Sequence, residues 1–102
     1  RSSDLFAVRD KYPVSPGHTL VIPRRVIPQW WDAAIDEQRA ILTLVDQVRS
    51  DLLDDETRAQ QLPNIPRPEG FNVGFNEGEV AGQTVNHLHM HVMGGPRPWA
   101  KG

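Results

Sequence analysis

Three of the four histidines in this 102-residue chain lie in one short stretch, His87-Leu88-His89-Met90-His91-Val92-Met93, or HLHMHVM. They occupy every second position, and the residues between them are apolar. In a β-strand, successive side chains point to opposite faces of the sheet. The stretch therefore predicts a strand over Val85–Met93 that turns its apolar residues into a core and presents three imidazoles on the other face.

Three other stretches also favour strands. They are rich in β-branched and aromatic residues or alternate with period two, and they are bounded by glycine, proline and polar residues. They span residues 5–8, 18–23 and 71–76. The first two are separated by a turn with two prolines and a glycine, so we expect them to pair in an antiparallel way.

The middle of the chain predicts one long amphipathic helix. Apolar residues recur at steps of three and four, which is the spacing of one helix face: Ile41, Leu44, Val45, Val48 and Leu52. Asp36 is the expected N-cap, with Glu37 in the first turn. We expect the helix to end between residues 54 and 60, because prolines at 63, 66 and 68 require a loop over residues 61–70.

The composition describes one globular domain over residues 1–102, with 38% hydrophobic and 24% charged residues. A net charge of −2 does not favour a nucleic-acid polymer or a membrane as partner. The chain has no apolar run long enough to span a membrane and no signal-peptide pattern, so we expect a cytoplasmic protein. Without cysteine there is no thiolate chemistry. The first residue is Arg1, which leaves open whether further residues precede it.

Three interpretations of the histidine row remain open on spacing alone. The imidazoles could be unrelated surface residues, ligands of a zinc ion, or a nucleophile with its supporting groups. A neutral imidazole is abundant near neutral pH, because its ordinary pKa is about 6.5. Asn76, Gln83 and Thr84 lie close in sequence and supply donors suited to phosphate oxygens. This neighbourhood favours phosphoryl-group chemistry.

The assembled motifs resemble those of the histidine triad (HIT) family. The family signature is His-φ-His-φ-His-φ-φ, where φ is a hydrophobic residue. Residues 87–93 match it fully. AGQTVNHLHMHV at residues 81–92, YPVSPGHTLVIPRR at residues 12–25 and FNVGFNEGE at residues 71–79 also look like family segments. The resemblance spans about residues 5–92.

This resemblance implies a fold and an activity. The fold would be of the α+β class, an antiparallel sheet of about five strands with one long and one short helix packed on it. Two copies would join their sheets in a homodimer. The activity would be hydrolysis or transfer at the α-phosphate of purine nucleoside phosphoramidates or dinucleoside polyphosphates, through a covalent nucleotidyl-histidine and with no metal or other cofactor.

The resemblance also implies roles for the four histidines. His89 would be the nucleophile, and His91 would contact the phosphate. His87 and the distant His18 would form a relay that orients the nucleophile.

Other residues match binding positions of the family. Asn76, Gln83 and Thr84 match positions that contact phosphate or leaving group, and Asp10 matches one that binds the ribose hydroxyls. Val26 replaces a histidine that many members carry, which affects a local contact only. The Gly94-Gly95 pair and Trp99 resemble the tail of the Hint branch, whereas YPVSPGHTL and FNVGFNEG look closer to the Fhit branch, so the preferred leaving group stays open. A metal-dependent hydrolase and a non-catalytic nucleotide-binding protein are the alternatives.

Overall fold

The computed structural model describes residues 5–9, 17–81, 83 and 87–94. It contains strands β1 (Leu5–Arg9), β2 (Thr19–Pro23), β3 (Phe71–Gly74) and β4 (Met90–Gly94), and helices α1 (Ile35–Leu53) and α2 (Asp55–Gln61). Two short 3-10 helices, η1 (Trp30–Asp32) and η2 (Glu79–Ala81), lie in the connections. The predicted α+β class, with one long and one short helix, is confirmed.

The sheet is antiparallel throughout, with the strand order β1-β2-β4-β3. The expected pairing of the first two strands is confirmed, and Ala7 lies opposite Val21. The described residues form four strands, where about five were expected. Because β4 pairs with β2 in the middle of the sheet, the histidine stretch is brought beside the segment that begins at His18.

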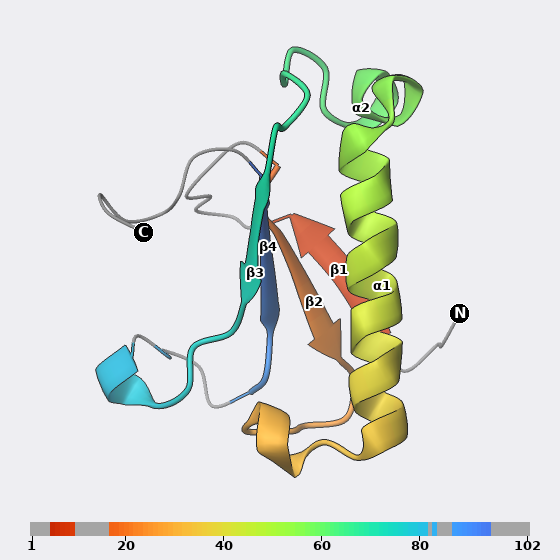
Figure 1. Cartoon of the computed structure of the whole chain (residues 1–102). Helices are drawn as coiled ribbons and strands as arrows, with labels where there is room; N and C mark the ends of the chain where they lie inside the picture. The colour runs from red at the N-terminus through yellow and green to blue at the C-terminus, as the bar shows by residue number, and fades with distance from the viewer. Residues whose placement is uncertain (1–4, 10–16, 82, 84–86, 95–102) are drawn as a thin grey trace.

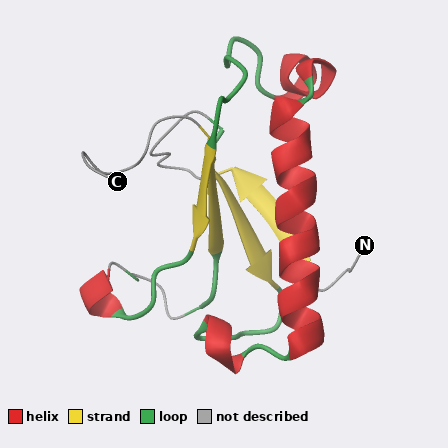
Figure 2. Ribbon diagram, viewed as in Figure 1, coloured by secondary structure: helices red, strands yellow, loops and turns green. Residues whose placement is uncertain are grey.

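One face of the sheet is covered by α1 (Figures 1 and 2). The predicted stripe of α1 packs on this face, with Leu44 at its partly buried margin. The buried core joins residues from the sheet, the connections and α1: Leu5, Val21, Ile27, Ala33, Ile41, Val45, Val48, Leu52, Leu88, Met90 and Val92. The core therefore lies on a single side of the sheet. No helix among the described residues is both long and apolar enough to cross a membrane.

The start of α1 differs from the prediction. Asp36 is not the N-cap, because the helix begins at Ile35 and Ala34 takes that position. The Glu37 carboxylate folds back to accept a hydrogen bond from the Ala34 N–H at 2.8 Å and also binds Arg25. Arg25 first, and then the Ala34 N–H, lower the pKa of Glu37 to about 2 from its usual 4.5.

Three further boundaries also differ. α1 ends at Leu53, and Asp54 caps a separate helix, α2, by accepting from the Thr57 N–H at 2.9 Å. β3 stops at Gly74, two residues before the predicted end. β4 begins only at Met90, so residues 87–89 precede the strand that was predicted to contain them.

Candidate active site

The alternation predicted for the histidine stretch is present in its burial pattern. Leu88 is 2% exposed, and Met90 and Val92 are also buried, whereas the three histidines between and beside them are half-buried. Leu20 lies opposite His91 and Val21 opposite Met90, so the register places His91 with Leu20 on the face away from the core. The prediction of opposite faces is correct, although only His91 lies within the strand. Packing of the apolar residues thus holds the segment even before the regular pairing begins.

His18 is brought against His91 by this register, although 73 residues separate them in sequence. Nε2 of His18 lies 2.9 Å from Nδ1 of His91, and the two ring centroids are 5.1 Å apart. Between two imidazoles one nitrogen must donate and the other accept. If His18 donates, a neutral His91 carries its proton on Nε2, where it can serve as a donor to a phosphate oxygen.

The position of His18 depends on the glycine before it. Gly17 has a φ of +82°, a conformation that side chains other than glycine rarely adopt. A Cβ at this position would also lie 3.1 Å from Cδ2 of Leu52 in α1. The close approach to α1 and the left-handed backbone at Gly17 lead the chain into β2, and His18, the residue just before this strand, is nearly completely buried.

The ring of His89 is oriented by the main chain. Its Nδ1 lies 2.9 Å from the carbonyl oxygen of His87. A carbonyl only accepts, so Nδ1 carries the proton, and in the neutral ring Nε2 is left with a free lone pair. The ring packs edge-on against His91, with centroids 5.0 Å apart. This is the tautomer that a nucleophile reacting through Nε2 requires.

His87 uses its side chain differently. Its Nε2 lies 2.9 Å from the carbonyl oxygen of Pro23, at the end of β2. Its Nδ1 is buried and has no hydrogen-bond partner in the part of the chain that the structure describes. The implied relay between His87 and His18 stays a prediction. Among the described residues, hydrogen bonds join His18 to His91 and His87 to the Pro23 carbonyl.

The amide of Gln83 joins two connections. Its oxygen accepts from Nε2 of Gln29 at 2.8 Å and from the N–H of Gly78 at 2.7 Å, and its nitrogen donates to the carbonyl of Pro28 at 3.1 Å. One amide hydrogen is left for a ligand. The expected phosphate contact of Gln83 stays a prediction, but most of its hydrogen-bonding capacity holds the loops together.

Asn76 follows β3 and is exposed, and its side-chain nitrogen donates to the carbonyl of Ala81 at 2.7 Å. Its expected role in phosphate contact likewise stays a prediction. Asp10 and Thr84, the other two expected binding residues, lie outside the described residues.

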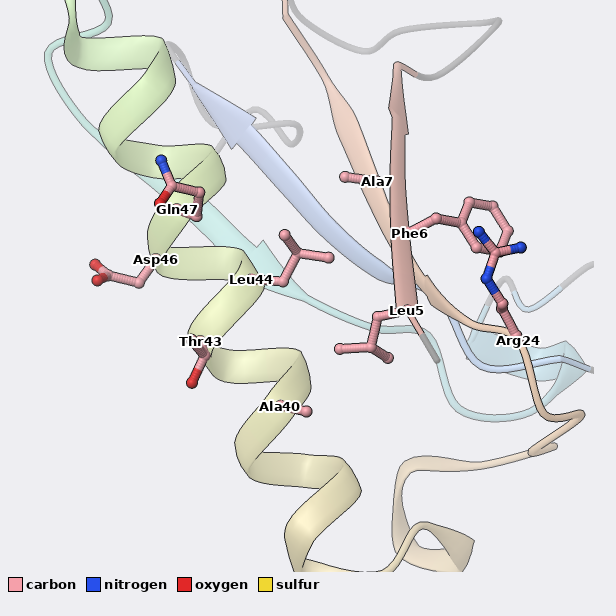
Figure 3. A pocket seen from close by; sticks show the side chains of 9 residues that line it. All are labelled: Leu5, Phe6, Ala7, Arg24, Ala40, Thr43, Leu44, Asp46 and Gln47. Carbon is pink, nitrogen blue, oxygen red and sulfur yellow. The ribbon is translucent and has the colours of Figure 1, made fainter. Parts of the chain in front are cut away.

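A groove of about 750 Å³ lies between β1 and α1. Leu44 of α1 points across it toward Leu5 and β1, and the Arg24 guanidinium packs over the Phe6 ring at its margin (Figure 3). None of the four histidines lines this groove. The groove is therefore separate from the candidate site formed by the imidazoles.

Several groups that shape the site were not foreseen from the sequence. They are main-chain carbonyls of Pro23, the last residue of β2, and of Ile27 and Pro28 in the connection that follows. Every residue carries such an acceptor, so no residue type signals its use. The prolines at positions 23 and 28 were the one available hint of a rigid backbone.

Comparison with known proteins identifies the family of this chain. The family model for the HIT domain matches residues 1–97, and the chain belongs to the histidine triad family. An AP-4-A phosphorylase of Mycobacterium tuberculosis is 35% identical over 94 residues, which cover 91% of this chain and 43% of that protein. The asymmetrical bis(5'-nucleosyl)-tetraphosphatase of Schizosaccharomyces pombe is 33% identical over 81 residues, which cover 79% of this chain and 39% of that protein.

The fold also matches solved structures. A HIT family protein from Bacillus anthracis superimposes with a TM-score of 0.76 at 28% identity, covering 95% of this chain and 62% of that one. The chain spans less than half the length of the two enzymes named above. Family and fold are therefore shown.

Proposed function

We propose that this chain is a nucleotide hydrolase or transferase that acts at the α-phosphate through a covalent nucleotidyl-histidine formed on His89. The observation that carries the proposal is the hydrogen bond from His89 Nδ1–H to the His87 carbonyl, which leaves Nε2 free to attack phosphorus. The substrates would be dinucleoside polyphosphates or purine nucleoside phosphoramidates. The names of the two similar enzymes support the first of these classes.

The first step would form a bond between Nε2 of His89 and the α-phosphorus and break the bond to the leaving group in line. The ring then carries substituents on both nitrogens and becomes cationic. The His87 carbonyl at Nδ1 stabilises this charge, because a hydrogen bond from a charged donor is stronger than a neutral one. Water would next cleave the P–N bond, restoring the neutral ring and releasing a nucleoside monophosphate.

We expect His91 to assist both steps as a donor to the phosphate, because its ring lies beside that of His89 and its Nδ1 is hydrogen-bonded to Nε2 of His18. Each well-placed donor in such a site is worth about 2–4 kcal/mol of transition-state stabilisation. Gln83, Asn76 and Thr84 would add phosphate contacts, and Asp10 would bind the ribose, as the family resemblance implies.

The sheet face of His91 also offers a surface for the nucleoside. Leu20 and Ile22 of β2 and Phe6 of β1 share this face by strand alternation, and all three are half-buried. Apolar walls with a few polar groups are typical of sites for small organic ligands. We propose that the purine lies along these side chains while the phosphate reaches His89.

The covalent intermediate can be tested directly. Rapid alkaline denaturation of the protein during turnover of a diadenosine polyphosphate labelled at the α-phosphate is expected to trap label on the chain. The label should be lost in acid, as for a P–N bond, and be absent from His89→Ala. Turnover should be unchanged by a chelator, because no metal is proposed.

Other outcomes would contradict the proposal in distinguishable ways. Loss of turnover with chelator, restored by zinc, would identify a metal-dependent hydrolase. Tight nucleotide binding with neither turnover nor label would identify a binding protein. Within the described residues, no three side chains of His, Cys, Asp or Glu cluster as a metal site.

We further propose that the active form is a homodimer with joined sheets. β3 is a terminal strand of the sheet, and its outer edge pairs with no other strand of the described chain. Such edges are ready templates for pairing with another copy. Sedimentation velocity at micromolar concentration should give twice the mass of one chain; a monomer across that concentration range would contradict this.

A further inference from the structure

The two residues that flank His18 are joined to each other and to the neighbouring strand. The buried Thr19 hydroxyl donates to the carbonyl of Gly17 at 2.8 Å and accepts a hydrogen bond from Nη1 of Arg9. Arg9 and Thr19 are also directly opposite each other in the pairing of β1 with β2. A hydroxyl can donate one hydrogen bond and accept others, so both bonds form together. One side chain thus connects the backbone on either side of His18.

Arg9 extends this connection to the helices. Its Nη2 donates to Oε1 of Gln61, the last residue of α2, at 2.9 Å. β1 runs toward the end of the sheet at which α1 meets α2 (Figure 1). Partial burial lowers the pKa of the Arg9 guanidinium, and the negative charge of Asp51 in α1 partly offsets this effect. Because the guanidinium is planar and holds its donors in a fixed fork, it links β1, β2 and α2 in one geometry.

The segment before His18 packs against the same two helices. A Cβ on Gly17 would lie 3.1 Å from Cδ2 of Leu52 in α1 and 3.6 Å from Cδ1 of Leu62, directly after α2. Such apolar contacts limit where the chain lies, but they have no preferred direction. The direction of the Gly17 carbonyl therefore depends on the hydrogen bond from Thr19. This carbonyl belongs to the planar peptide that also carries the N–H of His18.

We propose that Arg9 is a positioning residue, which acts through the Thr19 hydroxyl to fix the peptide before His18 and so holds the His18 ring against His91. This deepens the proposed function, on which only its kinetic consequence rests. A charged donor makes a stronger hydrogen bond and polarises the hydroxyl that accepts it, which strengthens the bond from that hydroxyl to Gly17.

The consequence reaches the reactive stretch through one contact. Nε2 of His18 lies 2.9 Å from Nδ1 of His91, and such a bond weakens steeply when either ring turns. Without Arg9 or the hydroxyl, the His18 ring should adopt further orientations. His91, whose ring packs against that of His89, would then lose the contact that orients it.

The first test compares Thr19→Val with Thr19→Ser. Valine keeps the branched shape and removes the hydroxyl, whereas serine keeps the hydroxyl. The readout is the NOE between carbon-bound ring protons of His18 and His91, whose ring centroids are 5.1 Å apart, recorded without nucleotide. Wild type and Thr19→Ser should show this NOE, and it should weaken several-fold in Thr19→Val and in Arg9→Met.

The kinetic test measures kcat and KM on a diadenosine polyphosphate. A displacement of about 1 Å can cost about 10²-fold in rate, and here it reaches the site indirectly, so we expect kcat to fall about 10-fold. KM should stay nearly unchanged in Thr19→Val and Arg9→Met, and Thr19→Ser should recover most of the lost kcat.

The double variant Arg9→Met/Thr19→Val shows whether Arg9 acts through the hydroxyl. If it does, the double variant should be no slower than Thr19→Val alone, because the second substitution interrupts a connection that is already lost. Independent effects would multiply instead.

Arg25→Met is the matched control. The Arg25 guanidinium also makes two hydrogen bonds, to the Glu37 carboxylate in α1, but these lie outside the connection to His18. Neither the NOE nor kcat should change. Melting curves identify any variant that fails to fold, and Arg9→Met, at a position that is exposed as a whole, keeps the test valid if Thr19→Val does so.

Two results would overturn the inference. One is an NOE between the two rings that is missing in wild type or unchanged in folded Thr19→Val and Arg9→Met. The other is a double variant whose loss is the product of the two single losses. Turnover that is absent in wild type would contradict the proposed function, yet the NOE still decides whether Arg9 positions His18.

Discussion

His89→Gly is expected to lower kcat by at least about 10³-fold, and loss of a nucleophile can cost about 10⁶-fold. The reason is chemical: Nδ1 of His89 donates to a main-chain carbonyl, which leaves Nε2 of its neutral ring to attack, whereas in His87 the nitrogen opposite the donor is buried. Nucleotide affinity should fall only a few-fold, because the apolar face and the proposed phosphate donors are retained. The measurement is single-turnover kinetics on a diadenosine polyphosphate, with AMP binding measured by calorimetry.

Imidazole rescue sharpens this prediction. The glycine variant leaves a space where free imidazole can bind and attack phosphorus in place of the side chain. Millimolar imidazole should therefore restore part of the turnover to His89→Gly and none to a variant that fails to bind nucleotide. A folded His89→Gly that retains more than a tenth of wild-type kcat without imidazole would rule out His89 as the nucleophile.

Ile41→Ala is expected to reduce the free energy of unfolding by about 3–4 kcal/mol. Ile41 is the first residue of the α1 stripe, is fully buried and belongs to the core that supports β2 and β4. Truncation removes three carbon atoms from water-excluded packing and leaves a cavity that neighbours fill only in part. Since small domains are stable by about 5–15 kcal/mol, this is a large fraction of the total.

Leu42→Ala is the natural control. It removes a similar volume one residue further along the same helix, at a position that is 51% exposed. This substitution should change the free energy of unfolding by no more than about 0.5 kcal/mol. Urea denaturation followed by circular dichroism measures both variants, at one protein concentration because assembly shifts apparent stability. If both variants lose the same free energy of unfolding, the α1 stripe does not form the core of the fold.

Much of the fold was predictable because burial leaves a periodic trace in the sequence. The stripe from Ile41 to Leu52 identified a helix, and its face was confirmed. The alternation in HLHMHVM separated buried from half-buried residues correctly, even where no strand forms. Boundaries were less predictable. Asp36 is a good N-cap by residue type, yet Glu37 accepts from Ala34 and is held by Arg25, a contact across 12 residues.

The candidate site was predictable in its residue types but not in its contacts. Which imidazole lies against His18 depends on strand register, and the opposition of Leu20 and His91 places His91 there. The amide of Gln83 is a group that can bind phosphate, but in the folded chain most of its hydrogen-bonding capacity joins two loops. The main-chain acceptors at Pro23 and Ile27 have no signature at all, because a carbonyl is present at every position.

The sequence by itself determined the class of fold, the face on which the histidines lie and the family, since apolar periodicity and motif spacing are properties of the chain alone. Tertiary structure decided which histidine bonds to which group and, through the His87 carbonyl, which nitrogen of His89 is free. The physical reason is that hydrogen bonds depend on distance and direction between segments far apart in the chain. Only the packed sheet sets those quantities.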